Sequence, residues 1–151
     1  MGYIEDLREV VGNRPLNLVG TAVGVINEKG EILLQQRLNG VWGVPGGFLE
    51  LGESTEEAGR REVLEETGLQ IGKMDLVSVF SGKEHYVKLP NGDEFYPITI
   101  VYVTRDIVGG ELDVNRDEGM DAQFFSLYNL PENINPLIPK FLHTYLQTRK
   151  V

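Results

Sequence analysis

The chain has 151 residues, enough for one compact domain, and its 41% hydrophobic and 25% charged residues are ordinary for a folded protein. With 14 Lys+Arg against 23 Asp+Glu, the formal net charge of −9 disfavours non-specific binding to the negative phosphates of DNA or RNA. The absence of cysteine excludes disulfides and thiolate chemistry, and two histidines are too few for a histidine-rich metal cluster.

The first half of the chain shows helical and then strand-like patterns of apolar residues. In order, these patterns predict a helix at 3–11, a strand at 18–26, a turn at 28–30, a strand at 32–37 and a loop at 38–47. One face of the first strand carries Gly20, Ala22 and Gly24. Residues this small would let another backbone or a ligand come close to the sheet.

The second half contains a helix with signals at both ends. Ser54 and Glu57 match a capping box, and Gly68 suits the left-handed position that follows a helix. Asn91-Gly92 predicts a tight hairpin, because both residues tolerate positive φ. The remaining expected segments are strands at 74–80, 84–89, 95–104 and 123–127, a break at 109–110, and a last helix after Asn135-Pro136. Together they indicate an α+β class or a mixed sheet between helices.

Three carboxylates share one edge of the helix that follows Ser54. Glu62, Glu65 and Glu66 are related by steps of three and four residues, which places them on one face. Small residues continue this face toward the N-terminus, whereas an ordinary packing face would be aliphatic. Clustered like charges are destabilising, so a hard divalent cation such as Mg²⁺ or Mn²⁺ is the simplest partner. The alternatives are a solvated acidic face and a purely structural Ca²⁺ site.

The segment from Gly47 to Leu69 resembles the Nudix box of the Nudix hydrolase (MutT-like) superfamily. Every fixed position of the pattern is filled, from Gly47 through Glu53 to the run Arg61–Leu69, which is REVLEETGL. The run-in 42–47 and the pair Phe124-Phe125 also resemble the regions that flank the box. The resemblance implies an α/β/α sandwich around a mixed, largely antiparallel sheet, in a single domain over residues 1–151.

The resemblance also implies a chemistry. Nudix enzymes hydrolyse a phosphoanhydride bond in a nucleoside diphosphate linked to another group, with Mg²⁺ as cofactor and Mn²⁺ as a possible substitute. Glu62, Glu65 and Glu66 match the metal ligands of the box, and the Gly46 carbonyl would add one more oxygen. Glu65 and Glu66 are also the candidate catalytic groups on the helix. Glu118, just before the final strand, is the candidate general base in a later loop.

Further residues match supporting or substrate-binding positions of the family. Glu53 and Arg61 match a pair that braces the loop against the helix, the alternative being a surface ion pair. Gly47 and Gly68 would serve the backbone geometry. The candidate substrate-binding residues outside the box are Arg37 for a phosphate oxygen and Tyr86 for a nucleoside, although Tyr86 would equally suit the core.

The substrate lies beyond what the box specifies. A nucleoside triphosphate or a modified nucleotide removed in housecleaning is the first candidate. The alternatives are a dinucleoside polyphosphate, ADP-ribose or a nucleotide sugar, and a non-catalytic regulator that binds nucleotides. A proline that tends to mark ADP-ribose hydrolases is missing from 70–89. We expect a small-molecule nucleotide as partner, no nucleic acid or membrane, and a possible homodimer. The acidic start and the lack of a long apolar run predict a cytoplasmic location.

Overall fold

The computed structural model describes residues 2–113 and 121–148. Its helices are α1 (Tyr3–Val11), α2 (Thr55–Thr67) and α3 (Leu137–Thr148), with a 3₁₀ turn η1 (Lys83–His85). Its strands are β1 (Leu16–Val25), β2 (Glu31–Gln36), β3 (Trp42–Gly43), β4 (Gly46–Phe48), β5 (Leu69–Ile71), β6 (Asp75–Phe80), β7 (Val87–Lys88), β8 (Glu94–Thr104), β9 (Ile107–Gly110) and β10 (Asp121–Ser126). Within these residues, every helix is too short or too polar to cross a lipid bilayer.

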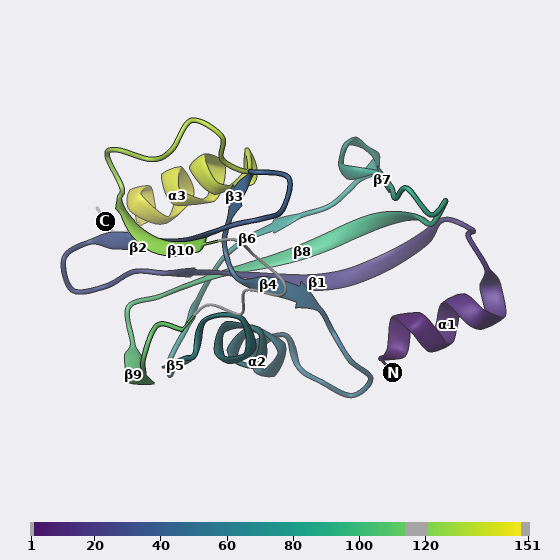
Figure 1. The fold of residues 1–151 in the computed structure, drawn as a ribbon, viewed down its shortest axis with the longest axis horizontal. Helices are drawn as coiled ribbons and strands as arrows, with labels where there is room; N and C mark the ends of the chain where they lie inside the picture. Colours follow the sequence, from purple (N-terminus) through teal and green to yellow (C-terminus); the bar gives the residue numbers. More distant parts are fainter. Residues whose placement is uncertain (1, 114–120, 149–151) are drawn as a thin grey trace.

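A five-stranded mixed sheet forms the centre of the molecule. Its strands run in the order β4-β1-β8-β6, and β7 also pairs with β8. Only the long β1–β8 pair is parallel, while the other pairs are antiparallel. Figure 1 shows α2 on one side of this sheet and α3 on the other. The expected class, an α+β sandwich around a mixed and largely antiparallel sheet, is confirmed.

The two faces of β1 pack against different helices. Val23 points toward α2, where a Cβ on Gly59 would lie 3.1 Å from a Val23 methyl. Gly24 faces α3 instead, and a Cβ on it would lie 3.2 Å from the ring of Phe141. The small residues predicted on one face of this strand therefore allow a close approach, in this case by a core side chain.

Three local predictions are wrong, and all of them involve very short elements. The expected loop 38–47 contains β3 and the start of β4, and the expected strand 84–89 is η1 followed by β7. The expected break 109–110 is the end of β9, where Gly110 pairs with Leu69. Strands of two to four residues carry too few side chains to show alternation. Here β3, β4 and β7 are held by pairing with longer strands, and β9 by pairing with β5. The Asn91-Gly92 hairpin is confirmed between β7 and β8.

Candidate functional site

Helix α2 is placed tightly against the sheet by its ends and by its small residues. The Ser54 hydroxyl accepts the Glu57 N–H at 3.0 Å, and Gly68 ends the helix with φ of 80°. Ala58 and Gly59 are buried, and Gly59 lies against Val23 of β1, so the helix axis comes close to the sheet. This packing places Glu62 against Gly47 of β4 and Glu66 against Gln35 near the end of β2.

Glu66 is the buried acid of this helix, with 7% of its surface exposed. One carboxyl oxygen accepts hydrogen bonds from the Gln35 amide and, at 3.3 Å, from Arg37. The other accepts the Gly46 N–H at 3.2 Å. Burial and then the neighbouring Glu62 carboxyl raise the pKa of Glu66 to about 8, against the opposing effect of the Arg37 charge.

Arg61 connects the other two acids of the box helix to the preceding loop. Its guanidinium forms a bidentate pair with Glu53, at 2.6 and 2.9 Å, and donates to the Phe48 carbonyl at 3.2 Å. The remaining nitrogen lies 2.7 Å from Glu62 and 3.3 Å from Glu65. The hydrogen bonds from Arg61 hold the pKa of Glu53 below its usual value. Arg61 thus links the helix to the loop that precedes it through Glu53 and Phe48. The Glu53 side chain is only 13% exposed, so this pair is not an ordinary surface ion pair.

Replacing Arg61 by glutamine should lower the free energy of unfolding by about 2 kcal/mol, since charge-assisted hydrogen bonds to a poorly exposed carboxylate are lost. For a domain of this size, the melting temperature should fall by roughly 4–8 °C. Glu56→Gln is the matched control, because it breaks a 3.8 Å pair with Arg60 on the exposed face of the same helix. That pair should contribute less than about 0.5 kcal/mol. Equal melting temperatures for the two variants would contradict the bracing role.

The raised pKa of Glu66 predicts a pH dependence of stability in the metal-free protein. The unfolded chain releases this proton near its ordinary value of 4.5, whereas the folded chain keeps it until about 8. Folding therefore takes up a proton between these values, and the free energy of unfolding should fall as the pH rises through them. Urea denaturation in EDTA at several pH values measures this slope. In Glu66→Gln it should be flatter, and an unchanged slope would assign the effect to other groups.

The acidic groups suit a hard divalent cation in their chemistry, although they are not closed around one. Within residues 2–113 and 121–148, no three acidic or histidine side chains are gathered closely enough to hold an ion. Glu62 and Glu66 are neighbours, whereas Glu65 is 58% exposed and turned to Arg61. A Cβ on Gly47 would lie 2.6 Å from the Glu62 carboxyl carbon, so the loop leaves space for that carboxylate. Carboxylate oxygens are the ligands that Mg²⁺ prefers.

The predicted residues outside the box have different positions. Arg37 follows β2 and donates to Glu66 and, at 3.2 Å, to the Val44 carbonyl, so it lies at the acidic site. Tyr86 donates its hydroxyl to Glu94, and its ring centre lies 5.3 Å from that of Tyr96. These contacts place Tyr86 beside the β7–β8 hairpin. Glu118 lies outside the described residues.

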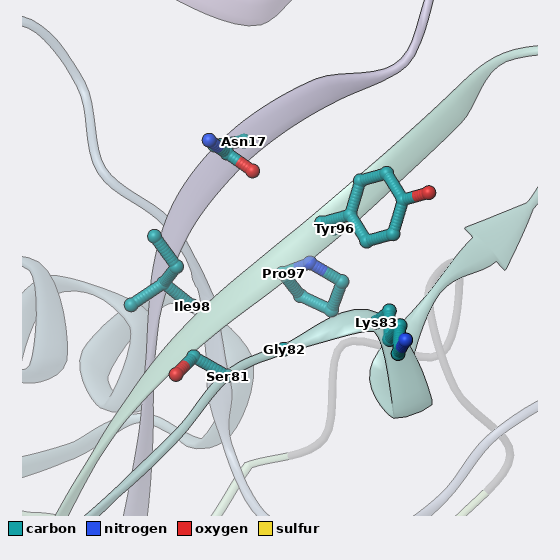
Figure 2. Close-up of a pocket in the computed structure, with 7 residues that line it drawn as sticks. All are labelled: Asn17, Ser81, Gly82, Lys83, Tyr96, Pro97 and Ile98. Atoms are coloured by element: carbon teal, nitrogen blue, oxygen red, sulfur yellow. The ribbon is translucent and has the colours of Figure 1, made fainter.

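A pocket of about 180 Å³ adjoins the box loop. It is lined by β1, β8 and α3 together with Gly43 and Gly46. A second pocket, of about 400 Å³, lies where β1 and β8 meet the connection from β6 to η1. Figure 2 shows its lining side chains, which include Asn17, Tyr96 and Lys83. None of the acidic box residues lines the second pocket.

Gln35 was missed as a site residue, although it is buried and donates directly to Glu66. The usable signal was its place in β2, where it follows three buried aliphatic residues and continues the buried run of that strand. A polar side chain in such a position needs a hydrogen-bond partner. The identity of the partner depends on the packing of α2, which the sequence pattern of β2 does not contain.

This chain is similar to known proteins over most of its length. Residues 17–145 match the NUDIX domain family. An ADP-ribose pyrophosphatase of Methanocaldococcus jannaschii is 41% identical over 113 residues, which cover 72% of this chain and 62% of that protein. A putative 8-oxo-dGTP diphosphatase of Bacillus subtilis is 44% identical over 62 residues, which cover 40% of this chain and 42% of that protein. The matched region is thus less than two thirds of the length of either relative.

Solved structures show the same architecture. A MutT NUDIX hydrolase from Burkholderia pseudomallei superposes with a TM-score of 0.71 at 26% identity, over 85% of this chain and 97% of that one. A MutT protein from Methanosarcina mazei gives a TM-score of 0.72 over 91% and 99%, and its 24% identity supports the fold alone. Because the family match covers most of the residues, including the whole box, the chain belongs to the Nudix hydrolase superfamily.

Proposed function

We propose that this chain hydrolyses a phosphoanhydride bond in a nucleoside diphosphate linked to a further group, with Mg²⁺ or Mn²⁺ held by Glu62, Glu65 and Glu66. The observation that carries the proposal is the buried Glu66 carboxyl, fixed by Gly46 and set beside a second acid. Two neighbouring carboxyls, one of them buried, repel each other when both are ionised, and a bound divalent cation would offset this repulsion. Their placement beside a glycine-rich loop supports a role in catalysis rather than in stability.

The residues of the site would have different roles in the reaction. When bound, the cation would neutralise phosphate charge and lower the pKa of water. Glu62, Glu65 and Glu66 would hold it together with the Gly46 carbonyl. Arg37 uses one donor on Glu66 and one on Val44, and its guanidinium has further donors for a phosphate oxygen. Glu65, which is exposed and forms an ion pair with Arg61, is also a general-base candidate on the helix, as is Glu66. Glu118 remains the candidate in the later loop.

For the substrate, we place ADP-ribose ahead of nucleoside triphosphates. The named activity of the M. jannaschii relative supports this order, despite the proline missing from 70–89. The pocket beside Gly46 is smaller than the roughly 300–1,000 Å³ of most ligand sites, so it suits one ring system of such a substrate. Nucleoside triphosphates stay the second candidate, since a relative named as an 8-oxo-dGTP diphosphatase shares the box region.

The test is a nucleotide panel with Mg²⁺ or Mn²⁺, read by chromatography of the products. Hydrolysis of ADP-ribose adds water across the diphosphate and yields AMP and ribose 5-phosphate, whereas a nucleoside triphosphate yields its monophosphate and pyrophosphate. AMP from ADP-ribose supports the first candidate, and pyrophosphate supports the second. Nucleotide binding without any product would identify a non-catalytic regulator and contradict the proposal. Light scattering of the same protein tests the predicted homodimer.

A further inference from the structure

Thr21, near the middle of β1, carries a buried hydroxyl without a hydrogen-bond partner. The residue is 4% exposed, and its Oγ1 is the one buried side-chain nitrogen or oxygen left unpaired in the part of the chain that the structure describes. Other buried threonines are satisfied: Thr67 and Thr104 each donate to a main-chain carbonyl at 2.6 Å. An unpaired buried hydroxyl is destabilising, so the unpaired hydroxyl of Thr21 needs an explanation.

The strand register directs this hydroxyl toward the acidic site. Thr21 lies directly opposite Gly47 in the antiparallel β1–β4 pair, and opposite residues project to the same face, roughly 5 Å apart. A Cβ on Gly47 would lie 2.7 and 2.8 Å from the two oxygens of Glu62. Val23, two residues along the same face of β1, borders Gly59 of α2. Thr21 therefore projects between the sheet and α2, on the side that carries Glu62.

The strand neighbours of Thr21 on this face are apolar, and the nearby Tyr102 hydroxyl is already hydrogen-bonded to Thr55 of α2. On its second side, Thr21 is paired with Ile100 of β8, which is apolar. Along β1, the next residues on the same face are Val19 and Val23, also apolar. The register brings Gly47 opposite Thr21, and the carboxylate of Glu62 lies against Gly47 on the same face, without a hydrogen bond to the Thr21 hydroxyl.

We infer that Thr21 is a positioning residue of the acidic site, and that its hydroxyl hydrogen-bonds to a water molecule of the hydrated divalent cation bound at Glu62. Mg²⁺ keeps several of its waters when it binds to proteins, and these waters need acceptors. A threonine hydroxyl has two acceptor lone pairs for this purpose. The inference rests on the proposed function, because it requires that an ion binds at this site.

The test compares Thr21→Val, which removes the hydroxyl at nearly constant shape, with Thr21→Ser, which keeps it. Mn²⁺ is titrated by calorimetry into the purified chain without nucleotide, and the melting temperature is measured in EDTA. Thr21→Val should melt at or above the wild-type temperature yet bind Mn²⁺ about fivefold more weakly, a difference of about 1 kcal/mol. Thr21→Ser should bind within about twofold of the wild type. If the Thr21→Val variant does not fold, Thr21→Ala is tested in its place.

Thr104→Val is the matched control, since it removes a buried threonine hydroxyl that is already hydrogen-bonded to the Lys73 carbonyl. It should lower the melting temperature and leave Mn²⁺ binding unchanged. Unchanged Mn²⁺ affinity in Thr21→Val, or an equal loss in Thr21→Ser, overturns the inference, because the hydroxyl would then not matter. If the wild-type chain binds no Mn²⁺, the proposed function is overturned together with this inference. The Mn²⁺ titration of the wild type distinguishes this outcome from failure of the inference alone.

Discussion

Glu66→Gln should lower Mg²⁺-dependent turnover by more than about a hundredfold, because even residues that merely support a metal ligand typically account for about 10- to 100-fold. Glutamine keeps the size of Glu66 but cannot ionise to bind a cation, at a position that is 7% exposed and adjoins Glu62. The fold should persist, since Val63 and Thr67 on the same helix remain buried. Steady-state kinetics on the best panel substrate and circular dichroism give the two measurements.

A thermal scan separates loss of the ion from loss of the fold. Anything that binds only the folded state raises the melting temperature, so Mn²⁺ should stabilise the wild type and have little effect on Glu66→Gln. The control is Glu56→Gln, which makes the same charge change on the exposed face of α2. Its turnover should stay within about twofold of the wild type, as is usual for an exposed substitution. Near-normal turnover of Glu66→Gln would show that Glu66 is not a ligand.

The elements that the sequence predicted well are those with local causes. Helix α2 begins at a side-chain cap from Ser54 and ends at a left-handed Gly68, and both signals lie within the helix's own residues. The β7–β8 hairpin likewise follows from Asn91-Gly92. Strands β3 and β4 were missed because their glycines pair through backbone groups and show no side-chain alternation. Their existence depends on pairing with β2 and β1, which the residues of β3 and β4 do not encode by themselves.

For the acidic site, the sequence predicted which residues share a helix face but not the environment of each. Helical spacing places Glu62, Glu65 and Glu66 on one face, but spacing treats the three as equivalent. In the structure, Glu66 is buried under Gln35 and Arg37, whereas Glu65 remains exposed beside Arg61. This difference arises from the end of β2, which packs on one edge of the helix. Packing against residues distant in sequence therefore determines the electrostatic environment of each acid, and the motif alone does not predict that packing.

Gly47→Ala should weaken Mn²⁺ binding and turnover by more than about tenfold while the fold survives. The new methyl group would lie 2.6 Å from the Glu62 carboxyl carbon, which is the far end of a flexible side chain, so Glu62 would move rather than the backbone. The melting temperature should fall by less than about 3 °C. Mn²⁺ titration, kinetics and a thermal scan measure the three effects.

Gly46→Ala, one residue earlier, serves as the comparison, because we expect it to lower stability strongly rather than to displace Glu62. Its methyl group would collide with the main-chain carbonyl of Thr21 in β1, which cannot move without breaking the β1–β4 pairing, so a large loss of stability is expected. Gly24→Ala would crowd Phe141 on the opposite face of the sheet and should lower stability without changing Mn²⁺ affinity. If Gly47→Ala bound Mn²⁺ as the wild type does, displacement of Glu62 would be harmless, and Glu62 would have to be removed from the ligand set.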